Sequence, residues 1–159
     1  MKNTLLLVLS AITLTACNAS TEEIKNQQVE NENPILQEWD TPFGLPPFDK
    51  IKSEDYLPAY KTAIAEHKAE IDAIIKNEEA PTFTNTIEAL EFAGNNLTKV
   101  SSLFSCLEAA NTDDVLKATN KELAPILSSH YDNIMLNEDL FKKIKSVYDE
   151  KEALNLKPI

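Results

Sequence analysis

The 159-residue chain has no arginine and only two glycines, two cysteines and one tryptophan. Without arginine, and at a net charge of −11, it lacks the cationic surface that phosphate backbones and anionic headgroups require, so nucleic acid is not an expected partner. Its only local cluster of cations, Lys142, Lys143 and Lys145, is predicted to be a solvated helix face. Gly44 and Gly94 are too far apart to form a glycine-rich phosphate-binding loop.

Residues 1–16, "MKNTLLLVLSAITLTA", have the pattern of a secretory signal peptide, with an early cation, an apolar run and small residues at the end. The apolar run is too short to cross a bilayer about 30 Å thick. Residues 14–17 resemble a bacterial lipobox, so we expect cleavage before Cys17 and lipid attachment to its sulfur. The alternative is an ordinary signal peptide followed by a coincidental cysteine. A lipidated Cys17 predicts a protein held on a membrane of the cell envelope, facing the periplasm or the cell surface.

The next two segments differ in composition. Residues 17–32 are polar and almost free of bulky apolar side chains, which predicts a disordered tether. Residues 33–57 are rich in proline and aromatic residues, and we refer to them as the strap. The strap is too rich in proline for a helix, and we expect its Trp39, Phe43 and Phe48 to pack against the helices that follow.

Residues 58–159 are predicted to be helical, and no segment alternates as a strand would. Pro58 suits a first helical turn, "NEEAPT" at residues 77–82 separates two helices, and Thr82 is the expected N-cap of the second. We expect Thr112 to cap a third helix, with a kink or restart at Pro125, and Asn137 to open a last one. The fold class is therefore all-α, with about four long helices after the strap.

Apolar residues at helical spacing define the faces that these helices should bury. The expected stripes are Tyr60, Ile64, His67, Ile71 and Ile74; Phe83, Ile87, Leu90, Gly94, Leu97, Val100, Phe104 and Leu107; Leu116, Thr119, Leu123, Ile126, His130 and Ile134; and Phe141, Ile144, Tyr148 and Leu154. The second stripe predicts one helix of nearly 30 residues, in which Gly94 lets another helix approach closely. Cys106 lies in the same stretch and is expected to be a small core residue.

The residues themselves indicate no catalytic or metal site. His67 and His130 both lie on apolar stripes, so each is expected to be a packed or boundary histidine. His67 and Glu70 alone make a poor zinc site, since no second histidine is near in sequence. Ser128, Ser129, His130 and Asp132 are helical neighbours and do not form a nucleophile–base–orienter line.

The segments "PPFDKIK", "YLPAY" and "APTFTNTIEALE" nevertheless resemble a known N-terminal region. They are similar to the start of the thimet oligopeptidase family of zinc metallopeptidases, specifically its peptidyl-dipeptidase (dipeptidyl carboxypeptidase) branch, and the resemblance runs from residue 33 to about 156. It implies the N-terminal part of a larger helical fold, a wall over a channel that admits short peptides, and zinc in the full-length family.

The resemblance carries over no catalytic or metal residue, because the family's His-Glu-x-x-His motif does not occur in this sequence. Two hypotheses follow. The chain is a segment of a secreted, lipid-anchored peptidase and is inactive alone, or it is a free-standing helical lipoprotein with a binding or interaction role.

Overall fold

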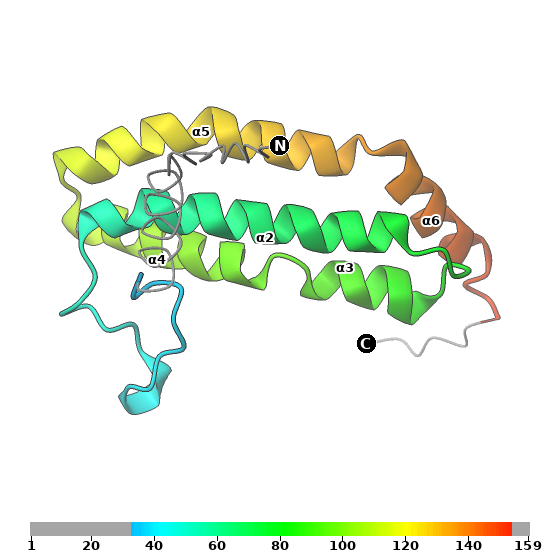
Figure 1. The fold of residues 1–159 in the computed structure, drawn as a ribbon, viewed down its shortest axis with the longest axis horizontal. Helices are drawn as coiled ribbons and strands as arrows, with labels where there is room; N and C mark the ends of the chain where they lie inside the picture. The colour runs from blue at the N-terminus through cyan, green and yellow to red at the C-terminus, as the bar shows by residue number, and fades with distance from the viewer. Residues whose placement is uncertain (1–32, 154–159) are drawn as a thin grey trace, which may run out of the picture.

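The computed structural model describes residues 33–153, and every regular element among them is helical (Figure 1). Four helices have 12 residues or more: α2 (Tyr56–Lys76), α4 (Asn95–Asn111), α5 (Asp114–Met135) and α6 (Glu138–Asp149). The shorter elements are η1 (Pro42–Gly44), η2 (Ser53–Asp55), η3 (Phe83–Glu88) and α3 (Ala89–Phe92). The predicted all-α class is confirmed for the described part of the chain.

Helix α2 is the centre of the arrangement (Figure 1). Helix α5 runs along one side of α2, α3 and α4 run along the other, and α6 lies near the end of α2. Helix α6 contacts both η3 and α2. Because each neighbour covers a different part of its surface, α2 needs apolar residues on more than one stripe, and Ala59 and Ala63 are fully buried beside Tyr60.

The core is divided into two apolar clusters along the length of α2. The larger cluster joins the strap, the first half of α2, α4 and the first half of α5, and its buried members are Ile35, Tyr56, Ala59, Tyr60, Ala63, Leu97, Val100, Leu103, Phe104, Leu116 and Leu123. The smaller cluster joins the second half of α2 to α6, and its buried members are Ile71, Ile74 and Leu140. Each cluster excludes water from one end of the bundle.

The predicted continuous helix after Thr82 is wrong, because the chain breaks at Gly94. Residues Phe83–Glu88 form a π-helix, α3 ends at Phe92, and α4 begins only at Asn95. Gly94 has a φ of 77°, a left-handed conformation that side chains disfavour and glycine adopts freely. The predicted close approach at Gly94 is confirmed, since an added Cβ would lie 2.9 Å from the His67 ring.

Pro58 lies in the first turn of α2, and two of the three predicted capping residues are right. Thr82 and Asn137 both cap as expected, and the side chain of Asn137 accepts a hydrogen bond from the Leu140 N–H. Thr112 is wrong by one residue, because the Asp113 side chain accepts from the Leu116 N–H and so caps α5. The helix restart expected at Pro125 is also wrong, since α5 continues through that residue.

Helix α6 buries only part of the predicted face: Ile144 packs against the smaller cluster as expected, but its neighbours on that stripe do not. Leu140 and Val147 are buried, whereas Phe141 and Tyr148 are 63% and 62% exposed. The two pairs have the same spacing of seven residues, so periodicity alone could not distinguish them. The orientation follows from the contacts that α6 makes with η3 and α2. Leu154, the last residue of that predicted stripe, lies outside the described residues.

The strap contacts the helices through both of its halves, since Ile35 is fully buried and Ile51 packs against the larger cluster. The Asn33 side-chain amide donates to the Asp55 carbonyl at 2.8 Å and so joins the two ends of the strap. The expected packing of Trp39 is confirmed, since it lies against the larger cluster with Lys99 Nζ 4.1 Å from its ring centre. The packing expected for Phe43 is wrong, because this residue in η1 is 97% exposed. Phe48 is 56% exposed and lines a hollow between the strap and α4.

The Thr82 cap gives a direct test of how the second helical segment starts. Its hydroxyl accepts from the Asn85 N–H, and the Asn85 side chain accepts from the Thr82 N–H in return. We expect Thr82→Ala to lower the free energy of unfolding by about 1 kcal/mol. Thr84→Ala, at an exposed position two residues on, should change it by less than about 0.5 kcal/mol. Equal effects in urea denaturation would contradict the capping role.

Candidate functional site between α2 and α5

Two histidines from different helices meet in the middle of the bundle. Nε2 of His130 on α5 lies 3.0 Å from Nδ1 of His67 on α2, within hydrogen-bonding distance. The two rings are arranged edge to face, with their centres 4.9 Å apart. His130 is buried and His67 half-buried. Both residues lie on apolar stripes in the sequence, but their spacing of 63 residues gives no local signal of the pairing.

The histidine pair lies between the two apolar clusters. On α2, His67 follows the residues of the larger cluster and precedes Ile71, which begins the smaller one. On α5, His130 lies between Leu127 and Ile134 in the same way. Gly94, between α3 and α4, lies beside the His67 ring at the same level of the bundle. Its N–H donates to the Glu70 carboxylate at 2.7 Å. These residues form a polar layer between the two apolar clusters.

The environment of the pair favours its neutral form. Burial lowers the pKa of His67 below its ordinary value, although the nearby Glu70 carboxylate acts in the opposite direction. Burial also lowers the pKa of His130, and the neighbouring His67 lowers it further. One neutral ring must donate and the other accept for the bond between them to form.

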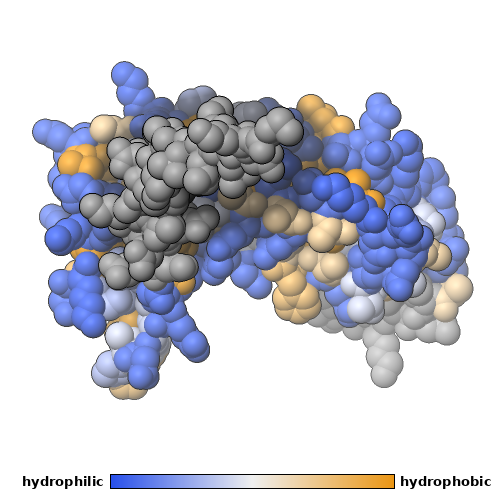
Figure 2. Space-filling view, viewed as in Figure 1, coloured by the Kyte–Doolittle hydropathy of each residue, from blue (hydrophilic) through white to orange (hydrophobic). Residues whose placement is uncertain are grey.

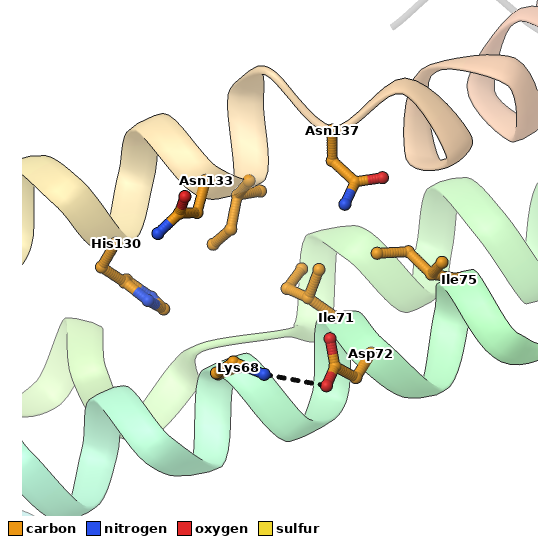
Figure 3. Close-up of a pocket in the computed structure, with 8 residues that line it drawn as sticks. Lys68, Ile71, Asp72, Ile75, His130, Asn133 and Asn137 are labelled. Atoms are coloured by element: carbon orange, nitrogen blue, oxygen red, sulfur yellow. Dashed lines mark hydrogen bonds and ion pairs between the residues drawn. The ribbon is translucent and has the colours of Figure 1, made fainter.

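A small polar pocket opens next to His130 (Figure 3). It has a volume of about 240 Å³ and lies between α2 and the second half of α5. Asn133 and Asn137 line it on one side, and Lys68 and Asp72 line it on the other. The remaining lining residues are Ile71, Ile75 and Ile134. A pocket of this size and lining can hold a small molecule with an apolar body and hydrogen-bonding ends.

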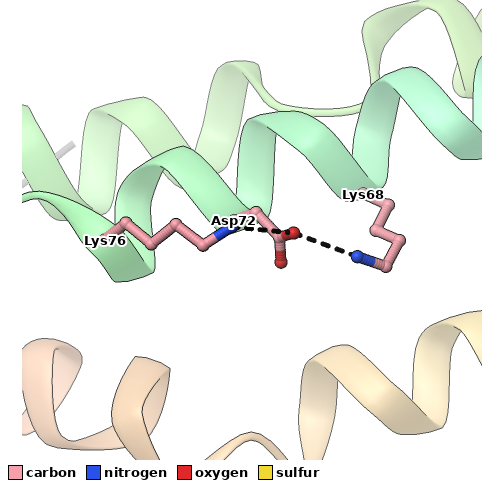
Figure 4. Close-up of polar contacts among 3 residues, drawn as sticks. All are labelled: Lys68, Asp72 and Lys76. Atoms are coloured by element: carbon pink, nitrogen blue, oxygen red, sulfur yellow. Dashed lines mark hydrogen bonds and ion pairs between the residues drawn. The ribbon is translucent and has the colours of Figure 1, made fainter.

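One edge of the pocket carries a row of alternating charges along α2 (Figure 4). The Asp72 carboxylate lies 3.0 Å from Lys68 Nζ and 3.4 Å from Lys76 Nζ. The hydrogen bond from Lys68 is the main reason that the pKa of Asp72 is lowered. These exposed ion pairs add little to the stability of α2. Their main effect is to place charged groups of both signs at the rim of the pocket.

A second hollow, of about 360 Å³, lies between the strap and α4. Its lining residues are Trp39, Leu45, Pro46, Phe48, Lys99, Ser102, Leu103 and Cys106. The prediction that Cys106 is a core residue is wrong, because its side chain is exposed. It lies on the α4 face that the strap leaves partly open.

The other residues considered in the sequence have ordinary structural roles. Lys142 and Lys145 pair with Asp139 and Asp149 on α6, as expected of a solvated face. Lys143 does not, because its Nζ donates to the Asn77 carbonyl at the end of α2. Ser128 and Ser129 are exposed. Cys17, the predicted lipid attachment site, lies outside the described residues together with the signal peptide and the tether.

The described residues do not fit a catalytic zinc site. Such a site takes three protein ligands and an open position. Within residues 33–153 no group of three or more His, Cys, Asp or Glu side chains is placed to hold a metal ion. His67 and His130 are two candidate ligands, but their facing nitrogens are hydrogen-bonded to each other.

None of the helices within residues 33–153 combines the length and the apolar composition that a membrane span requires.

Comparison with known proteins finds clear relatives. No family model matches the chain. It is 36% identical over 124 residues to the dipeptidyl carboxypeptidase of Salmonella typhimurium and 37% identical over 124 residues to that of Escherichia coli, which is 78% of this chain and 18% of either relative. It is 26% identical over 117 residues to oligopeptidase A of Salmonella typhimurium, which is 74% of this chain and 17% of that protein.

The chain is therefore homologous to a segment of dipeptidyl carboxypeptidases and, at lower identity, of oligopeptidase A. It spans less than a fifth of the length of these curated relatives. The resemblance to the peptidyl-dipeptidase branch is confirmed to this extent.

Proposed function

We propose that the described helices are the N-terminal helical segment of a zinc-dependent peptidase that acts on short peptides. In this proposal the segment forms part of the wall that limits access to the active site. The zinc ligands and the catalytic base belong to sequence outside residues 33–153. The observation that carries the proposal is the 36% identity over 124 residues to a dipeptidyl carboxypeptidase, of which those residues are 18%.

The negative net charge of the chain is compatible with a peptide substrate and disfavours a polyanionic one. The chain has 26 acidic residues against 15 basic ones and no arginine. A wall of this charge repels phosphate-bearing polymers, which need cationic surface to bind. On the face of the molecule drawn in Figure 2, the coloured residues are largely hydrophilic, and the apolar ones lie in patches among them.

The exposed apolar residues supply contacts for further parts of such a fold. Several large ones are clustered in sequence around the α5–α6 turn, and Met135 and Leu136 are 80% and 79% exposed. Phe141 and Tyr148 on α6 are also more than half exposed. Large side chains of this kind, when grouped, mark surfaces that contact other protein. In the proposed fold, later helices of the peptidase cover this end.

A segment exchange tests the proposal. The matched 124-residue segment of the Escherichia coli dipeptidyl carboxypeptidase is replaced by the corresponding part of this chain. We expect the chimera to fold and to release C-terminal dipeptides from short peptides, with kcat/KM within about tenfold of the parent enzyme, because the catalytic residues are unchanged and the wall is restored. This chain alone, supplied with zinc, should release none.

The control for the exchange is the parent enzyme with the segment deleted, which should be inactive or unfolded. A chimera that shows a cooperative thermal transition but no dipeptide release would overturn the proposal. That result would favour the alternative, a helical lipoprotein with a binding role of its own. Dipeptide release by this chain alone would contradict the assignment of the catalytic groups to other sequence.

The proposed location is the cell envelope, with the protein anchored by a lipid on Cys17. Acyl chains contribute about 0.8 kcal/mol per buried CH₂, so a multiply acylated cysteine holds a protein stably on a membrane. We expect Cys17→Ser to move the protein from the membrane fraction to the soluble fraction after expression in bacteria. Cys106→Ser is the matched control and should leave the distribution unchanged. Continued membrane association of Cys17→Ser would exclude the anchor.

A further inference from the structure

We propose that the His67–His130 pair is an acid-sensitive latch that holds α5 against α2 at neutral pH and releases it when both rings are protonated. The proposal is independent of the peptidase role. It rests on the hydrogen bond between the two rings, on their position in the bundle, and on the groups that surround them.

Proton counting explains why the second proton is the one that matters. With no added proton, one neutral ring donates to the other across the 3.0 Å contact. With one added proton, a charged ring can still donate to a neutral one. With two, both facing nitrogens carry hydrogen, so the bond is lost and two positive charges lie with ring centres 4.9 Å apart.

The groups around the pair give little compensation for the second charge. On α2, the Glu70 carboxylate favours a proton on His67 and also accepts from the Gly94 N–H, but its single negative charge can offset one added proton and not two. On the third side, Gly94 presents backbone against the ring and no side chain. On α5, the Tyr131 ring is 5.4 Å from His130, centre to centre. Lys68, which lines the pocket beside His130, adds positive charge.

The position of the pair along the bundle makes the second half of α5 the part that moves away from α2. Leu116 and Leu123 are fully buried and hold the first half of α5 in the larger cluster, whereas Leu127 and Ile134 of the second half are only partly buried against the two clusters. The described ion pair between the helices, Lys61–Glu122, is also in the first half and is exposed. The His67–His130 bond is therefore the main polar contact between α2 and the second half of α5. Its loss opens the pocket of Figure 3.

The direction of the pH dependence follows from the lowered pKa values of both histidines. Unfolded or released histidines bind protons at a pKa near 6.5, whereas the paired ones bind them only at lower pH. The latch is therefore fully closed above about pH 6.5 and weakens as the pH falls below that value, because the open state then binds more protons. Each histidine contributes up to a tenfold change in the open population per pH unit.

Amide hydrogen exchange of the full chain, corrected for intrinsic rates, tests the proposal. Between pH 7.5 and pH 5.5 we expect exchange in the second half of α5 to speed up by about tenfold or more relative to the first half. His67→Asn/His130→Gln keeps hydrogen-bonding groups near both ring positions but cannot be protonated. In this variant the relative change should be less than twofold. Lys61→Ala, which removes the Lys61–Glu122 ion pair between these helices, should keep the wild-type response.

A second measurement keeps the proposal testable if the double variant is poorly folded. The chain has only two histidines, so their NMR titrations in the wild-type protein can be followed individually. Both should titrate below 6.5, in two separated steps. Ordinary titration of both near 6.5, or a uniform exchange response along α5, would overturn the latch. So would an unchanged response in a folded double variant.

Discussion

Replacing Gly94 with alanine is expected to lower the free energy of unfolding by about 2–5 kcal/mol. Two costs add at this position. The left-handed conformation, at φ 77°, costs a residue with a side chain about 1–2 kcal/mol. The new Cβ would also lie 2.9 Å from the His67 ring, and crowding of this kind costs about 1–3 kcal/mol. The His130 bond holds His67 in place, so the ring cannot easily give way. Chemical denaturation measures the loss.

The other glycine of the chain is the matched control for this substitution. Gly44 has a similar φ of 65°, but nothing lies within 4 Å of an added Cβ. Gly44→Ala should therefore show only the conformational cost of about 1–2 kcal/mol. An effect at Gly94 no larger than that at Gly44 would show that the contact with His67 does not matter.

Truncation of Leu97 to alanine is expected to destabilise the fold by about 2–5 kcal/mol. Leu97 is 1% exposed and lies in the larger cluster, at the beginning of α4 just after the Gly94 break. The loss combines the transfer of the removed atoms with the cavity that they leave, since the rigid neighbours can fill it only partly. The midpoint of thermal or urea unfolding reports the change.

Leu136→Ala is the same substitution at a site that is 79% exposed. It should change the free energy of unfolding by less than about 0.5 kcal/mol. The comparison also bears on the proposed function, because Leu136 belongs to the surface that further peptidase sequence would cover. A large destabilisation by Leu136→Ala in the isolated chain would mean that this surface is already packed.

Local signals in the sequence were sufficient where the chain interacts with itself over a few residues. Thr82 and Asn137 were recognised as caps because a capping side chain needs only the next turn of its own helix. Asp113 was missed in favour of its neighbour Thr112 because both residue types cap helices well. Of the kink or restart predicted at Pro125, the restart does not occur, since α5 continues through this residue and is buried at Leu123 and His130 on either side of it.

Signals that depend on a partner helix were less reliable. The spacing of Leu140 and Val147 equals that of Phe141 and Tyr148, so only the packing of α6 against η3 and α2 selects the buried pair. Cys106 was assigned to the core by its apolar surroundings, but its face of α4 points to the hollow beside the strap. The exposure of Phe43 likewise follows from the turn at η1, which no stripe describes.

The sequence by itself determined the all-α class, most helix boundaries and the relationship to a segment of dipeptidyl carboxypeptidases, because helical periodicity, caps and local identity are properties of consecutive residues. Only the tertiary structure decided that His67 and His130 bond to each other, since they are 63 residues apart and no local rule connects them. The same holds for the close approach of Gly94 to His67, which leaves no room for a Cβ at this position. A pair between helices depends on the rotation of each helix about its axis, which the packing of the whole bundle sets.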